Sequence, residues 1–449
     1  MIAIARMAAL ALPLIYAPCI YAQVDPGERG GTSVGGTLPG LTFDELFVAA
    51  RSLARGFSND ELAILRNGFG PRFNGTKCIQ CHIHPTIGGS SPRSNPLALT
   101  VRQQNTVGGR NVLPPFNEGE NPVRVARFKY KPNGAPDGGV HNLFVISGIV
   151  SGSGDASGCN IEQPDFATEL ARNNLAFRIP TPVFGLGLME QIPETTLIQN
   201  LSADAARKAE LDISGRVNRN PNDGRVARFG WKAQNVSGAM FTAEAFNVEQ
   251  GITSELFPIE RDETPGCQLA RLPNHVVSIG ANFVPTAVTP VEAANIFMQL
   301  SAGPQPSADT PGGADSINRG RTTFSNIGCD QCHTPTLRTG DTQVAALRFK
   351  DANLYSDLAL HNMGPGLADD ISQGKAAGDE FRTAPLWGVG QRIYFLHDGR
   401  TNNLIEALLA HQSAGNSRYG TSEASRVIDN YSALSASDKQ DLLNFLRSL

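Results

Sequence analysis

The chain has 449 residues, enough for two or three domains with hydrophobic cores of their own. Its formal net charge is −4 and it contains no basic run, which argues against a protein that grips nucleic acid. With 46 glycines and 29 prolines, the composition predicts helices separated by long loops and argues against a large sheet.

The first 22 residues have the features of a secretory signal peptide. Arg6 precedes an apolar run that is too short to span a bilayer, and cleavage is expected after Ala22. No later stretch is apolar enough to cross a membrane, so we expect an exported mature protein without a membrane span. Cys19 could instead mark a lipoprotein, but the Tyr-Ala-Pro before it makes a poor lipobox, so this alternative is less favoured.

A glycine-rich segment follows the expected cleavage point. Residues 23–40 include the run DPGERGGTSVGGTLPG, whose glycines favour a flexible leader. A helix is expected from Thr42 to Ala54, because its apolar residues fall on one face. This helix precedes the first of two cysteine motifs.

The pattern Cys-x-x-Cys-His occurs twice, as Cys78, Cys81 and His82 and again as Cys329, Cys332 and His333. This spacing is the attachment signature of a c-type haem, since two thiols add to the haem vinyl groups and the adjacent imidazole becomes the proximal iron ligand. A redox disulfide would follow a strand, and none is evident. A shared zinc would have to join pairs about 250 residues apart and would leave both histidines unexplained. The sequence therefore predicts two covalently attached haems c.

The segment between the two motifs contains many turns and few long periodic runs. We interpret residues 41–290 as an N-terminal cytochrome c-like haem domain with loop-rich insertions. Two further cysteines, Cys159 and Cys267, lie in it. An oxidising compartment favours a disulfide between them, and two unrelated buried thiols are the alternative.

Residues 301–449 are expected to form a second cytochrome c domain, introduced by a linker at 301–314. Apolar residues at helical spacing precede the second motif, and the chain ends in an amphipathic helix with Ser435 or Ser437 as its N-cap. The sequence therefore predicts a mainly α fold of two cytochrome c-like domains, the first with long loop-rich insertions.

Two segments of the chain echo each other. FRIPTPVFGLG, residues 177–187, is similar to FRTAPLWGVG, residues 381–390, and each lies downstream of a cysteine motif. The echo indicates two related haem domains, and two independent proline-glycine turns are the alternative.

Several segments resemble known di-haem proteins. The line FRTAPLWGVGQRIYFLHDGRTNNLIEALLAHQ is similar to a segment of bacterial di-haem cytochrome c peroxidases. LHNMGPGLAD (360–369), GLGLMEQIPE (185–194) and GRVARFGWKAQ (224–234) resemble more closely a sister group, the di-haem oxidoreductases described as peroxidases or thiol oxidoreductases. The resemblance extends from about residue 45 to the C-terminus.

The resemblance implies a periplasmic protein that accepts electrons at one haem and reduces peroxide or another small substrate at the other. A small cytochrome c or cupredoxin would be the electron donor, and a calcium ion between the domains is left open. A di-haem cytochrome that only transfers electrons is the first alternative, and it would be favoured if both irons carried two strong axial ligands. Oxygenase or protein-modifying chemistry is the second.

His411 is the expected sixth ligand of the second haem. It ends the apolar face of a helix that begins near Asn403. It also stands fourteen residues after His397, where the resembling peroxidases place a methionine ligand. Met363 is the second candidate, and His397 is expected to bond a propionate or a backbone group.

The sixth ligand of the first haem is left open by the sequence. His141 borders an apolar run and is interpreted as a core histidine rather than a ligand. His84 is expected to be exposed, and His275 and His361 carry no signal either way.

Peroxide cleavage needs an acid–base group above the distal side of the iron. By the resemblance, Glu249, eighteen residues after Trp231, is the candidate acid, and Trp231 is the candidate electron bridge between the haems. A solvated carboxylate and a packed indole are the alternatives, and Glu190 is the competing carboxylate. The peroxidases also carry a glutamine ten residues before the glutamate, where this chain has Ala239.

The predicted arrangement assigns the two haems different tasks. The C-terminal haem, with His333 and His411 as ligands, would transfer electrons, and the N-terminal haem on His82 would be the reaction centre. Arg228 and Lys232 are expected to contact haem propionates.

Overall fold

The structure is a computed structural model that describes residues 23–31, 36–58, 70–151, 154–259, 264, 266–268, 278–279 and 285–449. The predicted signal peptide, residues 1–22, and His275 lie outside these ranges. Within the described ranges, no helix combines the length and the apolar character that crossing a bilayer requires.

Several helices begin where a polar side chain caps the first turn. Thr42 and Thr289 each close a capping box, in which the glutamate three residues later returns the hydrogen bond. Ser435 caps the terminal helix, as predicted, and accepts from the Asp438 N–H at 3.1 Å. The α-helices are α1 (Phe43–Ser52), α2 (Cys78–Cys81), α3 (Leu97–Thr106), α4 (Phe166–Ala171), α5 (Leu186–Glu190), α6 (Glu194–Ser202), α7 (Ala205–Glu210), α8 (Gly238–Gln250), α9 (Pro290–Gln299), α10 (Ala314–Ile327), α11 (Gly364–Leu367), α12 (Leu404–Leu409), α13 (Ser425–Ala433) and α14 (Ala436–Ser448).

Short antiparallel strand pairs recur throughout the described chain, so the fold is mixed, and the predicted mainly α class is not confirmed. The largest sheet has the strand order β3-β2-β7. Most strands have only two residues, too few to show an alternating pattern in the sequence. The strands are β1 (Arg72–Phe73), β2 (Val125–Phe128), β3 (Val140–His141), β4 (Phe144–Val145), β5 (Val150–Ser151), β6 (Gly154–Asp155), β7 (Leu175–Arg178), β8 (Asn218–Arg219), β9 (Val226–Ala227), β10 (Ser278–Ile279), β11 (Pro285–Ala287), β12 (Leu337–Arg338), β13 (Asp351–Ala352), β14 (Leu360–Asn362) and β15 (Glu380–Arg382).

Three large apolar cores can be traced in the described residues. The first surrounds the β1–β4 pair and contains Phe73 and Phe144. The second packs α10 against α14 and contains Phe324 and Phe445. The third surrounds α5, α8 and α9 and also takes in Trp387 from the C-terminal part. The two predicted domains therefore share a core.

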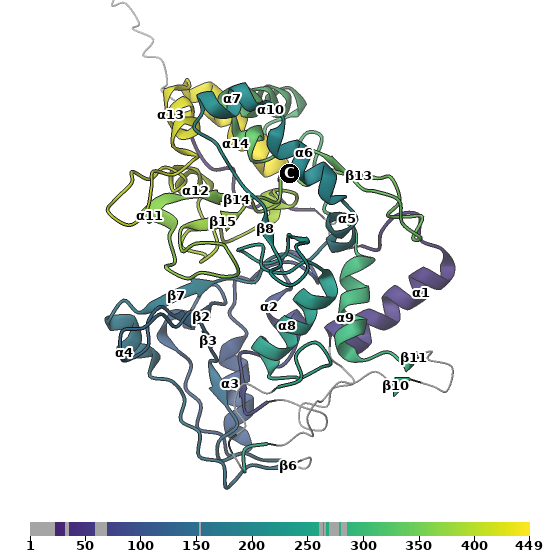
Figure 1. The fold of residues 1–449 in the computed structure, drawn as a ribbon, viewed down its shortest axis with the longest axis vertical. Coiled ribbons are helices and arrows are strands. Elements are labelled where there is room, and N and C mark those ends of the chain that lie inside the picture. Colours follow the sequence, from purple (N-terminus) through teal and green to yellow (C-terminus); the bar gives the residue numbers. More distant parts are fainter. Residues whose placement is uncertain are drawn as a thin grey trace, which may run out of the picture.

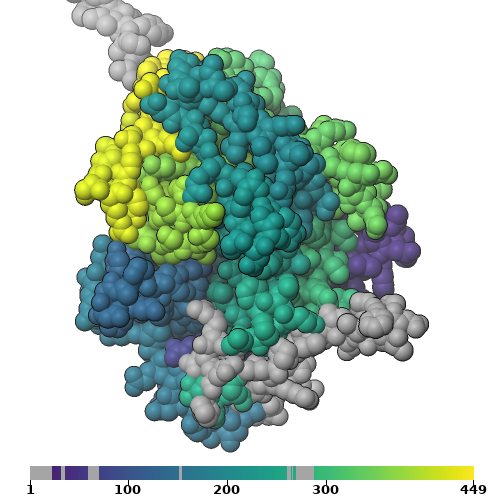
Figure 2. All heavy atoms as spheres, in the orientation of Figure 1, coloured from purple at the N-terminus to yellow at the C-terminus, as the bar shows by residue number. Residues whose placement is uncertain are grey.

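The N-terminal part of the chain contributes residues to the core of the C-terminal part. Helices α6 and α7 belong by sequence to the N-terminal part, yet Leu211 and Ile213 just beyond them join the C-terminal core. Asp212 also pairs with Arg426 of α13 at 2.6 Å. Figure 1 shows α6 and α7 at the top beside α10, α13 and α14. Figure 2 shows the teal part of the chain extending over this face from the top toward the N-terminal part.

Residues 23–31, part of the leader expected to be flexible, are hydrogen-bonded to the C-terminal part of the chain. The Asp25 carboxylate accepts two hydrogen bonds of 2.7 Å from the Arg447 guanidinium on α14. The Arg29 N–H donates to the Gly390 carbonyl at 2.7 Å, and its side chain reaches the Arg447 carbonyl at 3.2 Å. Residues 23–31 are therefore held in place by hydrogen bonds despite the glycine-rich composition of the segment.

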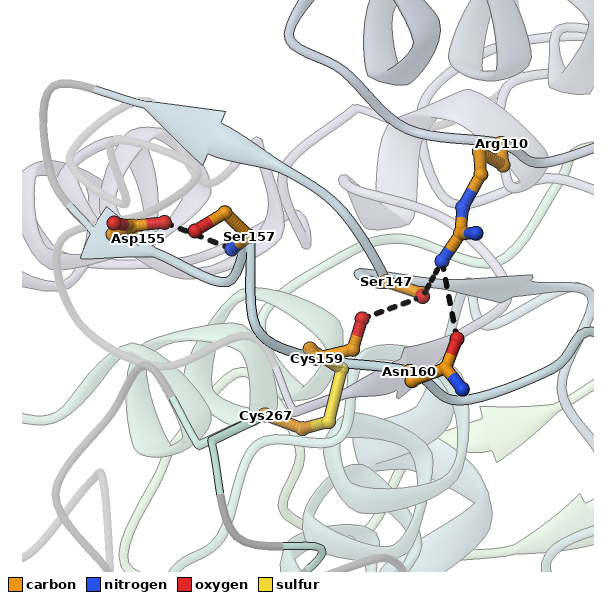
Figure 3. Close-up of a disulfide and its surroundings, with 7 residues drawn as sticks. All are labelled: Arg110, Ser147, Asp155, Ser157, Cys159, Asn160 and Cys267. Atoms are coloured by element: carbon orange, nitrogen blue, oxygen red, sulfur yellow. Dashed lines mark hydrogen bonds between the residues drawn. A yellow bond between two sulfur atoms is a disulfide. The ribbon is translucent and has the colours of Figure 1, made fainter.

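Cys159 and Cys267 form a disulfide, so the favoured pairing is present (Figure 3). Both residues are buried. The Ser147 hydroxyl donates to the Cys159 carbonyl at 2.8 Å and accepts from the Arg110 guanidinium at 2.6 Å. The bond ties the chain beyond α8 to the region of β5 and β6.

Removing this disulfide is expected to lower the free energy of unfolding by about 4 kcal/mol, because it joins residues 108 positions apart in the unfolded chain. Urea denaturation of Cys159→Ala/Cys267→Ala beside the wild type measures the loss. The single variant Cys159→Ala should lose about as much, since either change opens the same loop. An unfolding midpoint that neither variant moves would mean that the bond does not form in the exported protein.

Candidate functional site

The first Cys-x-x-Cys-His motif forms one helical turn. Helix α2 contains both cysteines, and His82 follows as its C-cap. The Nδ1 atom of His82 lies 3.1 Å from the carbonyl oxygen of Gly89. Because a carbonyl only accepts, Nδ1 carries the hydrogen and Nε2 keeps the lone pair that a metal needs. Burial lowers the pKa of His82 to about 4, so the ring is neutral near pH 7.

The second motif reaches the same arrangement through a different local structure. A 3₁₀ turn, Cys329–Gln331, follows α10 and precedes His333. The Nδ1 atom of His333 lies 3.0 Å from the carbonyl oxygen of Tyr355, whose φ of 52° is unfavourable for a residue other than glycine. Burial lowers the pKa of His333 to about 4 as well. The chain therefore holds a second neutral imidazole by its Nδ1 atom.

Each motif lines a cavity of its own. The empty space of the first cavity is about 1310 Å³ and that of the second about 1330 Å³, with the open solvent at their mouths included. None of the four motif cysteines is in a disulfide, and burial raises the pKa of all four thiols, to about 12 for Cys78. Each cavity thus presents two thiols that are outside any disulfide. Beside them lies a neutral imidazole whose Nδ1 atom is bonded to a backbone carbonyl. This donor set fits a covalently attached haem c.

His411 and Met363 both line the second cavity. The Nδ1 atom of His411 lies 2.8 Å from the backbone carbonyl four residues earlier, which leaves Nε2 with its lone pair. His361 also lines this cavity, but its Nδ1 lies 2.8 Å from Glu423 and its Nε2 lies 2.9 Å from Asp357. With both ring nitrogens occupied, His361 is not available to an iron ion.

Replacing His411 by alanine in the haem-loaded protein is expected to convert the second haem from a low-spin to a high-spin centre, because a strong axial ligand is lost. Electron paramagnetic resonance of the oxidised protein measures the change. Met363→Leu is the matched control and should leave the low-spin signal in place. The reverse result would assign the sixth position to Met363.

Trp231 lines both cavities. Its indole Nε1–H donates to the Ile179 carbonyl at 3.1 Å, and its own carbonyl accepts from the Arg382 N–H at 2.9 Å. The His397 ring, which lines the second cavity and stacks on Phe381 at 4.2 Å, meets the indole edge-on. The indole is therefore fixed between the two candidate haem sites.

The two carboxylates named from the sequence lie in different places. Glu249, on α8, lines the first cavity and accepts from the Asn74 side-chain amide at 2.8 Å. Glu190 lines neither cavity. It accepts from the Gly238 N–H at 3.0 Å and from the side-chain amide of Gln299, and so joins the start of α8 to α9. Its surroundings give Glu190 a structural role.

A second carboxylate of α8, Glu244, also lines the first cavity and was missed in the sequence. It accepts from the Asn235 side chain and lies 3.4 Å from the Gln234 amide nitrogen, which belongs to the same cavity wall. Gln234 precedes Glu244 by ten residues, the spacing at which the resembling peroxidases carry a glutamine and a glutamate. That spacing is the signal that could have found the pair.

The two basic residues expected at haem propionates are engaged elsewhere. The Nη1 atom of Arg228 donates hydrogen bonds to backbone carbonyls at the end of α5, including that of Met189 at 3.1 Å. Lys232 is fully buried and pairs with Asp369 at 3.0 Å. Neither lines a cavity, because each is held by backbone or carboxylate oxygens from distant segments.

Two other histidines lie away from the cavities. His84 pairs with Glu28 at 2.8 Å, and His141 stacks on Phe128 with 3.6 Å between ring centroids. Neither contributes to the wall of the first cavity. In the part of the chain that the structure describes, no group of three or more histidine, cysteine or carboxylate side chains is placed to hold a metal ion.

Comparison with known proteins gives one strong match. The family model described as "Di-haem oxidoreductase, putative peroxidase" matches residues 126–449, more than two thirds of the chain. Hydrazine synthase of Kuenenia stuttgartiensis is 18% identical over 37% of this chain and 59% of its own, with a TM-score of 0.23. A MauG-like protein associated with microbial copper homeostasis is 22% identical over 36% of this chain and 52% of its own, also with a TM-score of 0.23. Neither likeness bears on function at that level, and no curated protein matches.

Proposed function

The chain belongs to the di-haem oxidoreductase family, and on that premise we propose that it is a periplasmic c-type enzyme that accepts electrons at its C-terminal haem and uses them at its N-terminal haem to reduce peroxide. The observation that carries the proposal is the position of Trp231 in the walls of both cavities. The disulfide between Cys159 and Cys267 supports an oxidising compartment.

A bound haem c supplies one-electron redox chemistry and, where its sixth position is open, a place for peroxide. The chain would attach the two groups through Cys78 and Cys81 and through Cys329 and Cys332. His82 and His333 would hold the irons through Nε2, and the carbonyls that bind their Nδ1 atoms fix both rings in the required tautomer.

The second cavity has the features of an electron-transfer site. His411 offers Nε2 there as a second strong ligand in addition to His333. Two strong axial ligands close an iron to substrate and favour electron transfer. A small cytochrome c or cupredoxin would deliver the electrons, and Trp231 would carry them toward the first cavity.

The first cavity has the features of a reaction site. Among the described histidines, His82 alone lines it, so no second imidazole is positioned to close the iron. Glu244 and Glu249 both face this cavity from α8. Reduction of peroxide to water consumes two electrons and two protons, and a carboxylate at this wall can hold and deliver a proton. We assign that task first to Glu244, because the Gln234 and Asn235 amides orient it.

A protein that only transfers electrons is the alternative function. Met298 lines the first cavity and could give that iron a second ligand. Both haems would then be six-coordinate and unreactive toward peroxide.

Peroxide titration of the reduced haem-loaded protein distinguishes the two functions. If the proposal is right, each equivalent of peroxide should oxidise both haems rapidly, and the oxidised protein should show a high-spin signal from the first haem. Two low-spin haems that peroxide oxidises no faster than it oxidises a simple cytochrome c would favour the electron carrier.

A further inference from the structure

Each of the two segments that echo each other in sequence places an arginine in the wall of one cavity. Strand β7 ends at Arg178, which lines the first cavity, and strand β15 ends at Arg382, which lines the second. In the echo, each arginine follows a phenylalanine and precedes a proline-containing turn. Both arginines are more than nine-tenths buried.

Arg178 has a carboxylate partner but keeps one unsatisfied donor. Its Nη2 donates to Asp369 at 2.6 Å, and its Nη1 donates to the Gln373 side chain. Its Nε has no hydrogen-bond partner among the described residues, although it is buried. An unsatisfied buried N–H costs free energy unless a ligand supplies the acceptor.

Arg382 has no carboxylate partner within the described chain. Its Nε donates to the Gly230 carbonyl at 2.8 Å and its Nη1 to the Thr383 carbonyl at 3.3 Å. Burial, reinforced by the nearby Arg392, lowers the pKa of Arg382 to about 10, so it remains charged near pH 7. Arg392 lines the same cavity, and its Nε is also buried without a described partner. The charge of Asp357 opposes the lowering of the Arg382 pKa, but no carboxylate forms an ion pair with Arg382 or Arg392 within the described chain, so the two buried cations favour an anion in this cavity.

We propose that Arg178 and Arg382 are equivalent carboxylate-binding residues, each of which holds a propionate of the haem in its own cavity. The inference rests on the proposed function, because it supposes that each cavity receives a haem. Guanidinium groups bind carboxylates strongly, and a haem carries two of them into an otherwise apolar space. In this role the two arginines take the place of Arg228 and Lys232, which the sequence predicted at the propionates and which bind other partners.

The position of the two arginines also relates the carboxylate sites to Trp231. The Arg382 N–H donates to the Trp231 carbonyl, and the Trp231 indole donates to the residue after Arg178. The backbone of each arginine's segment is thus hydrogen-bonded to Trp231.

The haem-loaded variants Arg178→Gln and Arg382→Gln test the proposal, and each serves as the control for the other. We expect both variants to retain two haems by mass. A propionate without its guanidinium should bind a proton more tightly when its iron is reduced than when it is oxidised, so the midpoint potential of that haem should become pH-dependent. The slope should rise toward about 59 mV per pH unit, the limit for one proton taken up with one electron, within the range of pH 5 to 8 and for that haem alone. Potentiometric titration followed optically measures both haems, each assigned in a chain that lacks the cysteines of the other motif.

Three further variants complete the test. Arg178→Lys and Arg382→Lys retain the positive charge, so the midpoint potentials of both haems should depend on pH about as in the wild type. These variants keep the proposal testable if the glutamine variants fold poorly. Arg225→Gln, at an exposed arginine, should change nothing.

A pH dependence that is unchanged in both haems, or equally changed in both, would overturn the proposal. A wild-type potential that shifts on adding acetate would instead assign the arginines to an exchangeable anion. A protein with fewer than two haems would refute the proposed function before the arginines are tested.

Discussion

Replacing Glu244 by glutamine is expected to lower the rate of peroxide reduction by about 10²- to 10⁴-fold, the usual contribution of a positioned acid–base group. Glutamine keeps the shape of the side chain but cannot hold or deliver the proton. Because the change lies in the wall of the first cavity and not in either cysteine motif, haem content and both haem spectra should stay at wild-type levels. Steady-state peroxide consumption with a reduced donor measures the effect.

Glu249→Gln is the matched control, since it removes a second carboxylate from the same helix and the same cavity wall. Among the hydrogen bonds described above, Glu249 is held by one side-chain amide, that of Asn74, whereas Glu244 is held by two, and we expect a loss of less than about tenfold, or about 1.4 kcal/mol of barrier. Glu190→Gln, away from both cavities, should act on stability and not on turnover. The opposite order, with Glu249→Gln the slower variant, would return the acid–base role to the residue predicted from the sequence.

Replacing Trp231 by phenylalanine is expected to slow electron exchange between the two haems by at least about tenfold. The change removes the indole that lines both cavities and its hydrogen bond to the Ile179 carbonyl. Peroxide turnover should fall with it, because electrons would reach the first cavity more slowly. Stopped-flow mixing of the half-reduced protein with peroxide, monitored at both haems, measures the exchange directly.

Trp387→Phe provides the control, since Trp387 is the other tryptophan of the chain. It is buried in the shared core and contributes to neither cavity wall. This variant should lower the free energy of unfolding and leave the exchange rate unchanged. Equal rates in the wild type and Trp231→Phe would exclude the indole from the electron path.

Local features of the fold were predictable from the sequence. The Ser435 cap and the helix before the second motif depend on neighbouring residues alone. The mixed character was not predictable, because two-residue strands find their partners far along the chain, as Arg72 does with Val145. The same reason explains the anchored leader, whose Asp25 meets Arg447 at the opposite end of the sequence.

In the candidate sites, too, features that depend on neighbouring residues were predictable, and features that depend on distant residues were not. The paired thiols and imidazoles were predictable because haem attachment requires a short, fixed spacing. Glu244 was not predicted, because it follows Trp231 by only thirteen residues, a shorter separation than the resemblance to the peroxidases implies. Lys232 was misplaced because it adjoins Trp231 in sequence, whereas its partner Asp369 comes from a distant segment. The echo between residues 177–187 and 381–390 was visible, but only the structure places its two arginines in the two cavities.

Intact-mass measurement of the exported, denatured protein, together with its absorption spectrum, tests the central claim most directly. The account predicts a coloured chain that retains two haems after denaturation, because each is bound through two thioether links. Replacing Cys78 and Cys81 together should remove one haem, and replacing Cys329 and Cys332 should remove the other. A colourless chain, or one whose haem is released on denaturation, would contradict the account.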